Sequence, residues 1–246
     1  MSGHSKWHSI KHKKGIIDAK RGKIFTRHAN LITIAARSGG DPSINPTLRL
    51  AIENAKKDNT PNTNIERAIK RGTGELKGDA AIEEVIYETY APGGVAVMIE
   101  CLTDNKNRTF TNLRTVINKG GGQIAASGSV TYLFERRGVA RVPVPPAQRD
   151  EVSLLAIDAG ADDIQAEDEC LVIYSKPGNL SALSDALTKA GFAPANAEVQ
   201  MSPKTTVAIT DEAMAKRVLT LLDAIEDDND VVNISANFEI SDDLII

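Results

Sequence analysis

Apolar residues in the first third of the chain recur every three or four positions, which is the spacing of one helix face. The pattern predicts helices over 18–37, 45–59 and 63–72. In the first of these, Ile24, Leu31 and Ile32 carry the apolar stripe, and Gly39-Gly40 follows its end. We therefore expect a small N-terminal domain of three helices.

Residues typical of helix ends support these boundaries. Asn45 is suited to cap the second helix, and Pro46 follows at the first helical position. Residues 63–66 (TNIE) have the pattern of a capping box for the third helix. The glycine-containing stretch 72–79 predicts a hinge, so the helical domain should end near residue 80.

After residue 80 the pattern changes to short apolar runs separated by turns and helical stripes. Residues 82–134 predict the order ββαβ, with strands at 85–87, 94–102 and 130–134 and a helix at 108–119. Residues 137–203 predict βαββαβ, the order of a complete ferredoxin-like domain. A strand at 205–209, a helix at 211–225 and a strand at 231–238 close the chain.

These last elements supply the helix and strand that 82–134 lacks. We therefore predict an α+β fold, with an N-terminal three-helix domain followed by two ferredoxin-like α/β lobes, one inserted in the other. The predicted domains are a basic arm with the helical domain over 1–80, a split α+β domain made of 81–136 plus 204–246, and an inserted ferredoxin-like domain over 137–203.

Composition limits the class of protein. Hydrophobic residues make up 41% of the chain and charged residues 25%, which excludes wholesale disorder and a disulfide scaffold. The longest apolar run, 95–99, is far too short for a membrane helix, and the charged N-terminus does not fit a signal peptide. Cys101 and Cys170 lie in strand-like runs, so we expect core residues in a reducing cytoplasm.

The net charge of −4 conceals a strong asymmetry. Residues 1–80 contain 16 Lys and Arg against 7 Asp and Glu, a net of +9, whereas residues 81–246 contain 13 against 26, a net of −13. A basic arm on an acidic body favours a polyanionic partner, first of all nucleic acid. The alternative is a solvated tail that only aids solubility. No strong apolar face accompanies the charge, so we expect no membrane partner.

The arm itself contains the first candidate binding residues. Lys6, Lys11, Lys13 and Lys14 can each neutralise a phosphate. Trp7, the single tryptophan, could stack on an unpaired base or could instead pin the arm to the helical domain. His4, His8 and His12 share a spacing of four, but no Cys, Asp or Glu accompanies them, so we predict no metal site.

The first helix contains a second group of candidates. Lys20, Lys23 and Arg27 share one helical face, and Arg21 flanks it. Gly22 inside this helix costs about 1 kcal/mol relative to alanine. Either a close approach of the backbone to phosphate or tight packing against another helix would explain that cost.

A third group surrounds the helix that begins near residue 108. Its N-terminal N–H groups, together with Lys106 and Arg108, could hold an anion. The favoured alternative is ordinary capping by Asp104, Asn105 or Asn107, with Arg108 paired to a carboxylate of the acidic body. Gly120-Gly121-Gly122 could likewise approach a ligand, although a helix cap and turn suffice to explain it.

Catalytic patterns are lacking in the sequence. It contains no phosphate-binding loop, no dinucleotide fingerprint and no nucleophile elbow. We therefore predict a protein that is not an enzyme, with no cofactor and no small-molecule substrate.

Several motifs in order closely resemble the YebC/PmpR family. They are residues 3–7 (GHSKW), 18–27 (DAKRGKIFTR), 64–69 (NIERAI), 87–88 (YE), 92–94 (PGG), 103–105 (TDN), 107–109 (NRT) and 128–130 (GSV). The resemblance covers essentially the whole chain. One departure is Thr89, where the family usually has glycine. If that glycine holds a special backbone angle, we expect the end of this strand to differ from that of other members.

The resemblance implies a three-lobed fold and a cytoplasmic, DNA-binding transcriptional regulator. The family is also similar to a mitochondrial translational activator of cytochrome c oxidase, and some members are implicated in ribosome-associated help with proline-rich sequences. The sequence therefore predicts a nucleic-acid-binding regulator that acts on DNA or, alternatively, an RNA-binding translation factor associated with rRNA on the ribosome.

Overall fold

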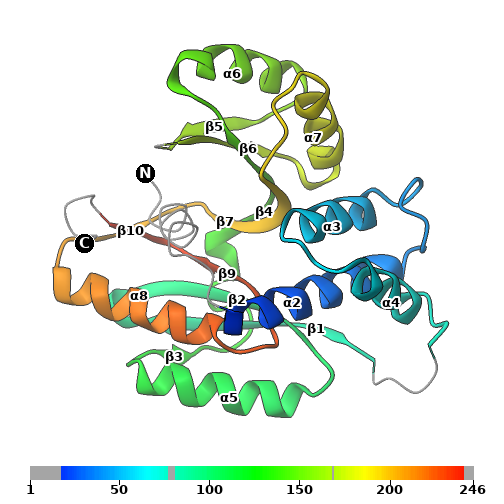
Figure 1. Cartoon of the computed structure of the whole chain (residues 1–246). Coiled ribbons are helices and arrows are strands. Elements are labelled where there is room, and N and C mark those ends of the chain that lie inside the picture. Colours follow the sequence, from blue (N-terminus) through cyan, green and yellow to red (C-terminus); the bar gives the residue numbers. More distant parts are fainter. Residues whose placement is uncertain (1–17, 77–80, 168, 241–246) are drawn as a thin grey trace. The chain divides into compact units, whose positions relative to one another are not determined.

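The computed structural model describes residues 18–76, 81–167 and 169–240. Its α-helices are α2 (Asp18–Ala36), α3 (Pro46–Lys57), α4 (Asn62–Gly72), α5 (Lys106–Lys119), α6 (Arg149–Asp158), α7 (Leu180–Lys189) and α8 (Glu212–Glu226) (Figure 1). The described strands form two four-stranded sheets and one two-stranded sheet. The fold is α+β with N-terminal helices followed by two α/β lobes, as the sequence predicted.

The chain divides into two compact units. One contains the residues up to Asn30 with Asp79–Glu135 and Met201–Ile246, and the other contains Leu31–Gly78 with Arg136–Gln200. The division places the first part of α2 with one lobe, and α3 and α4 with the other. Whether the three predicted domains fold separately stays a prediction.

The helix ends partly follow the sequence rules. The Asn45 side chain accepts a hydrogen bond from the Leu48 N–H at 3.1 Å, as expected of a cap. Its amide also donates to the carbonyls of Ala35 and Gly39, both at 2.8 Å, which fixes the turn after α2. The predicted capping box at 63–66 is wrong: α4 begins after Pro61 without a side-chain cap.

Helix α3 is held to the lobe of its own unit by polar contacts. The Arg49 guanidinium donates to Asp185 at 2.8 Å and to the Ser181 hydroxyl at 2.6 Å. Lys57 donates to the Pro194 carbonyl at 2.7 Å, and burial lowers the pKa of this ammonium. These two cations of the helical region are therefore engaged in holding the fold together.

The first sheet has the order β3-β1-β2-β9. Its strands are β1 (Glu83–Ala91), β2 (Val95–Thr103), β3 (Gln123–Ile124) and β9 (Val231–Ala236), and all neighbouring pairs are antiparallel. Helices α5 and α8 cover one face, where Leu113, Ile117 and Leu222 pack against Val97 and Ile99 (Figure 1). Strand β2 is buried on both faces, because Ala96 and Met98 contact a second cluster with Val130 and Phe134.

Two strand predictions in this lobe are wrong. Residues 131–133 form a 3₁₀ turn, and the fourth strand is the short β3 instead. The strand predicted at 231–238 divides at Asn237 into β9 and β10 (Phe238–Ile240). Asn237 causes the division, because its side-chain oxygen accepts from the Ala96 N–H at 2.7 Å and its own N–H donates to the Ala96 carbonyl at 3.0 Å. Strand β10 then pairs in parallel with β8 (Val207–Ile209).

The second sheet has the order β5-β6-β4-β7, which is that of a ferredoxin-like domain. Its strands are β4 (Phe134–Pro143), β5 (Asp163–Ala166), β6 (Cys170–Ser175) and β7 (Asn196–Pro203). Val152 and Ala156 of α6 and Leu183 and Leu187 of α7 pack on one face of it. In the part of the chain that the structure describes, no helix is long and apolar enough to cross a bilayer.

Candidate nucleic-acid interface

Several of the predicted binding residues lie outside the described residues. These are Lys6, Trp7, Lys11, Lys13 and Lys14, and the side chain of Lys20 is also outside the description. Among the described residues, no group of three or more His, Cys, Asp or Glu could hold a metal ion. His28, the one described histidine, is buried in α2.

The basic residues of α2 differ in what surrounds them. Arg21 is exposed and Arg27 is half-buried. The Lys23 ammonium donates to the carbonyl of Glu226, the last residue of α8, and lies 3.7 Å from the Asp227 carboxylate. A cation at this position complements the negative end of the α8 dipole. Lys23 thus joins α2 to α8, which limits its freedom to bind a phosphate.

The surroundings of Gly22 bear on the two explanations for a glycine inside α2, which are close approach of the backbone to phosphate and tight packing against another helix. A Cβ added at Gly22 would meet no atom of the described residues within 4 Å. Packing against another helix therefore does not require glycine here. Gly72 shows what such a requirement looks like, because a Cβ there would lie 2.3 Å from the Thr33 carbonyl oxygen. Among the described residues, nothing therefore requires glycine at position 22.

Helix α4 presents basic residues that the sequence reasoning missed. Arg67 and Lys70 are exposed, lie three positions apart on α4, and their side chains have no hydrogen-bond or ion-pair partner among the described residues. Lys56, in the last turn of α3, is exposed and equally without a partner in the described chain. The spacing of 67 and 70 on a predicted helix was the signal that could have found this pair.

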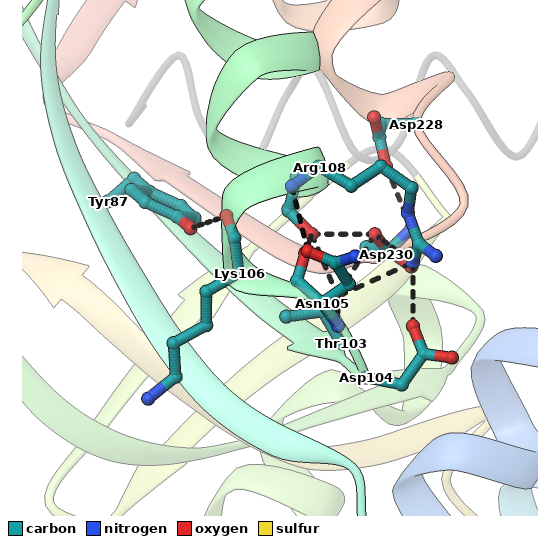
Figure 2. Close-up of polar contacts among 9 residues, drawn as sticks. Tyr87, Thr103, Asp104, Asn105, Lys106, Arg108, Asp228 and Asp230 are labelled. Atoms are coloured by element: carbon teal, nitrogen blue, oxygen red, sulfur yellow. Dashed lines mark hydrogen bonds and ion pairs between the residues drawn. The ribbon is translucent and has the colours of Figure 1, made fainter. Parts of the chain in front are cut away.

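The segment between β2 and α5 is arranged as an ordinary helix cap (Figure 2). The Asn105 side chain accepts from the Arg108 N–H at 3.1 Å, and the Thr103 hydroxyl accepts from the Asn105 N–H at 2.9 Å. The Arg108 guanidinium donates to Asp104 at 2.9 Å and to both carboxylate oxygens of Asp230, the closer at 2.9 Å. The first turn of α5 is therefore capped from within the chain.

The surroundings of Arg108 are negative overall. Asp104, Asp228 and Asp230 lie close to it (Figure 2). The Thr109 hydroxyl also donates to Asp230 at 2.7 Å. Hydrogen bonding to Asp230 and its charge raise the pKa of Arg108. Lys106 pairs with Glu83 at 2.6 Å. Of the two alternatives for Lys106 and Arg108, the structure shows capping and pairing with carboxylates, and the arrangement does not favour an added anion.

Glu88 holds the loop between β3 and β4. Its two carboxylate oxygens accept backbone hydrogen bonds from Gly128 and Val130, both at 2.6 Å, and from Thr131 at 3.0 Å. Burial by itself raises the pKa of Glu88, but these hydrogen bonds outweigh it and lower the pKa below its usual range. The carboxylate is thus an ionised structural anchor and not a proton donor.

The remaining sequence candidates have structural roles. A Cβ at Gly120 would lie 2.6 Å from Leu221, and one at Gly122 would lie 2.9 Å from the Tyr90 carbonyl oxygen, so these glycines permit close packing. Thr89 lies within β1, and its hydroxyl donates to the Gln123 carbonyl at 2.6 Å. The Cys101 thiol is buried, and burial raises its pKa, so it is unsuited to act as a nucleophile.

Comparisons with known proteins show which family the chain resembles. Two family models match: the TACO1/YebC protein N-terminal domain over residues 5–75, and the TACO1/YebC second and third domain over residues 82–238. A protein of Persephonella marina named "Probable transcriptional regulatory protein" is 50% identical over all of this chain and 98% of its own length. One of the same name from Aquifex aeolicus is 48% identical over the same shares.

A solved structure extends the likeness to the fold. The crystal structure of a conserved hypothetical protein from Aquifex aeolicus superimposes with a TM-score of 0.88 at 47% sequence identity. The match covers 96% of this chain and 98% of the other. With both family models matched and relatives similar over the full length, the chain belongs to the TACO1/YebC family.

Proposed function

We propose that this protein regulates gene expression in the cytoplasm by binding nucleic acid through its basic N-terminal arm and the exposed side of α2, as a DNA-binding transcriptional regulator. Its relatives are named as transcriptional regulatory proteins. The net charge of +9 over residues 1–80 supports a polyanionic partner, since the remaining residues carry −13 and would repel it.

The observation that carries this proposal is the open space at Gly22. Glycine in a helix costs about 1 kcal/mol relative to alanine, and no packing contact of the described residues requires it. Arg21 is exposed beside it, and Lys20 precedes it. A phosphate that approaches the backbone at Gly22 would meet two basic residues that directly precede it in the sequence. The cost of the glycine is then explained by binding.

The experiment compares Gly22→Ala with Thr111→Ala, an exposed position of α5 that lies outside the proposed interface. Both substitutions favour the helix, and Gly22→Ala should raise the free energy of unfolding by about 0.5–1 kcal/mol. Only Gly22→Ala should weaken binding of a fluorescent duplex DNA, measured by anisotropy at fixed salt. A stabilised Gly22→Ala variant that binds as tightly as the parent would contradict the role of α2.

The charged residues are tested by the salt dependence of binding. Lys20→Ala with Arg21→Ala should flatten the slope of log K against log salt by up to about 0.9 per lost phosphate contact. Adding Lys23→Ala and Arg27→Ala tests the whole predicted face. Because Lys23 also binds the end of α8, its variant must be compared at equal folded fraction. An unchanged slope would remove α2 from the interface.

A translation factor bound to rRNA is the second candidate function. Trp7, the single tryptophan, lies between charged residues of the arm, and an aromatic ring stacks well on unpaired bases. Co-sedimentation with ribosomes, with excess duplex DNA as competitor, separates the two functions. Retention on the large subunit would favour translation, whereas loss to the competitor would favour DNA.

A further inference from the structure

The outer face of α6 combines two exposed aliphatic side chains with acidic neighbours. Leu154 is 66% exposed and Ile157 is 57% exposed, and they lie three positions apart, on one side of the helix. Val152 and Ala156 already fill the opposite side, which faces the sheet. The core of this lobe therefore does not use Leu154 or Ile157.

Carboxylates flank this pair along the chain. Asp150 and Glu151 lie one turn before Leu154, and Asp158 follows Ile157. With Asp162 and Glu169, these are five exposed acids whose side chains have no hydrogen-bond or ion-pair partner among the described residues. Residues 150–169 contain no Lys or Arg at all.

The arginines that come nearest along the chain are already used by the fold. Arg141 forms an ion pair with buried Glu167 at 3.3 Å, and Arg149 donates to the Glu167 carbonyl at 2.7 Å. Arg137 stacks on the Tyr174 ring, with the guanidinium carbon 4.6 Å from its centre. The acidic face of α6 is therefore not neutralised by these residues of its own lobe.

The C-terminal end of α6 has a charge of the unfavourable sign for the helix dipole. Asp158 is its last residue, no basic residue lies in its last turn, and the amide of Asn179 caps the carbonyls of Ala159 and Gly160 at 3.1 and 3.0 Å. An acid at a helix C-terminus is unfavourable, because it lies at the negative end of the helix dipole. A cost with no gain in the folded chain indicates a use outside it.

We propose that the outer face of α6 is a docking surface for a lysine- or arginine-rich segment of another protein. Leu154 and Ile157 would contact apolar side chains of that segment, and the surrounding carboxylates would pair with its cations. Charge complementarity selects this partner, because the same carboxylates repel nucleic acid and anionic lipid.

The test uses the full chain and two fluorescent synthetic peptides. One contains lysine and leucine at helical spacing, and the other has serine in place of each leucine. The parent should bind the lysine–leucine peptide more tightly. Leu154→Ala with Ile157→Ala should weaken that binding about tenfold and leave binding of the lysine–serine peptide unchanged. Ile44→Ala, a 78% exposed isoleucine outside this surface, should change neither.

Folding and self-association are checked in parallel. Both side chains are exposed, so the double variant should retain the parent melting temperature, and a loss of binding then reports the surface itself. Equal binding of the lysine–leucine peptide by the double variant would overturn the proposal. Self-association is measured by sedimentation of the chain alone. If the parent forms dimers and the double variant does not, this face is a contact between copies of the chain, and the proposal of a basic partner segment is overturned.

Discussion

Helices α6 and α8 each cover one face of a four-stranded sheet in their own lobe, and both end in an acidic residue. At the end of α8, Lys23 donates to the Glu226 carbonyl and lies 3.7 Å from Asp227. At the end of α6, only the neutral amide of Asn179 is present, and Asp158 has no partner among the described residues. Charges around the first helix end are paired within the fold, whereas Asp158 at the second is not paired among the described residues.

The basic residues divide in the same way, into those paired within the fold and those without a partner among the described residues. Arg108, Lys106 and Arg49 lie near carboxylates and pair with them. Arg67 and Lys70 of α4 are exposed and have no pair in the described chain. A basic residue thus says little about nucleic-acid binding until its neighbours are known. The variants below test which charges the fold uses.

The largest effect is expected at Glu88, where one carboxylate satisfies three backbone N–H groups. Glu88→Gln places an amide nitrogen against a backbone donor, so it should lower the free energy of unfolding by about 2 kcal/mol in urea titrations. Glu84→Gln is the control, because Glu84 lies on the same strand and is exposed. Equal stability of the two variants would show that the Gly128–Thr131 loop does not depend on this carboxylate.

The sign of the pH dependence at Glu88 follows from its lowered pKa. Above the unfolded-state pKa, near 4.5, the full stabilisation is present, and it is lost as the pH falls through the lower folded-state pKa. Glu88→Gln should therefore lose part of the acid sensitivity of the parent below about pH 4.5. An identical acid profile for both proteins would exclude Glu88 as its source.

A smaller effect is expected at Asp230, which shares Arg108 with Asp104. The Asp230 side chain is 14% exposed and the Asp104 side chain 43% exposed. Asp230→Asn should cost about 1–2 kcal/mol of unfolding free energy. Half-exposed Arg108 and the hydroxyls of Thr103 and Thr109, which lie 3.2 and 2.7 Å from the Asp230 carboxylate, would lose an anionic acceptor. Asp104→Asn should cost less than about 0.5 kcal/mol. A larger loss of stability for Asp104→Asn than for Asp230→Asn would mean that solvent exposure does not determine how much each ion pair contributes to stability.

Which of these features the sequence could predict depends on how far apart the partners are in the chain. The helices and most strands follow from local periodicity, and the Asn45 cap from its neighbours. Lys23 and Glu226 are 203 residues apart, and Arg108 and Asp230 are 122 apart, so no spacing rule could pair them. Val130 and Phe134 are both buried and suggested a strand, but the chain between them forms a 3₁₀ turn held at its start by Glu88.

The contact at the end of α8 is expected to have a modest effect. Lys23→Met keeps most of the aliphatic chain but removes the cation, so it should cost about 0.5–1 kcal/mol of unfolding free energy. Lys216→Met is the control, since Lys216 is exposed in the N-terminal half of α8, where the dipole does not favour a cation. If both variants are equally stable, the contact of Lys23 with the end of α8 contributes nothing measurable to the free energy of unfolding. Lys23 would then again be a candidate to bind phosphate.

The smallest effects, of opposite sign, are expected at the two ends of α6. Glu151 lies in the first turn, where a negative charge is favourable, and Asp158 lies in the last, where it is not. Glu151→Gln should therefore lower the free energy of unfolding by about 0.3–0.5 kcal/mol, and Asp158→Asn should raise it by a similar amount. Both substitutions should nevertheless weaken binding of the lysine–leucine peptide, because each removes an anion beside Leu154 and Ile157. If the two variants change stability in opposite directions but both bind the peptide more weakly, the two acids act in binding independently of their effect on folding. If peptide binding instead rises and falls with stability, both acids affect only the fold.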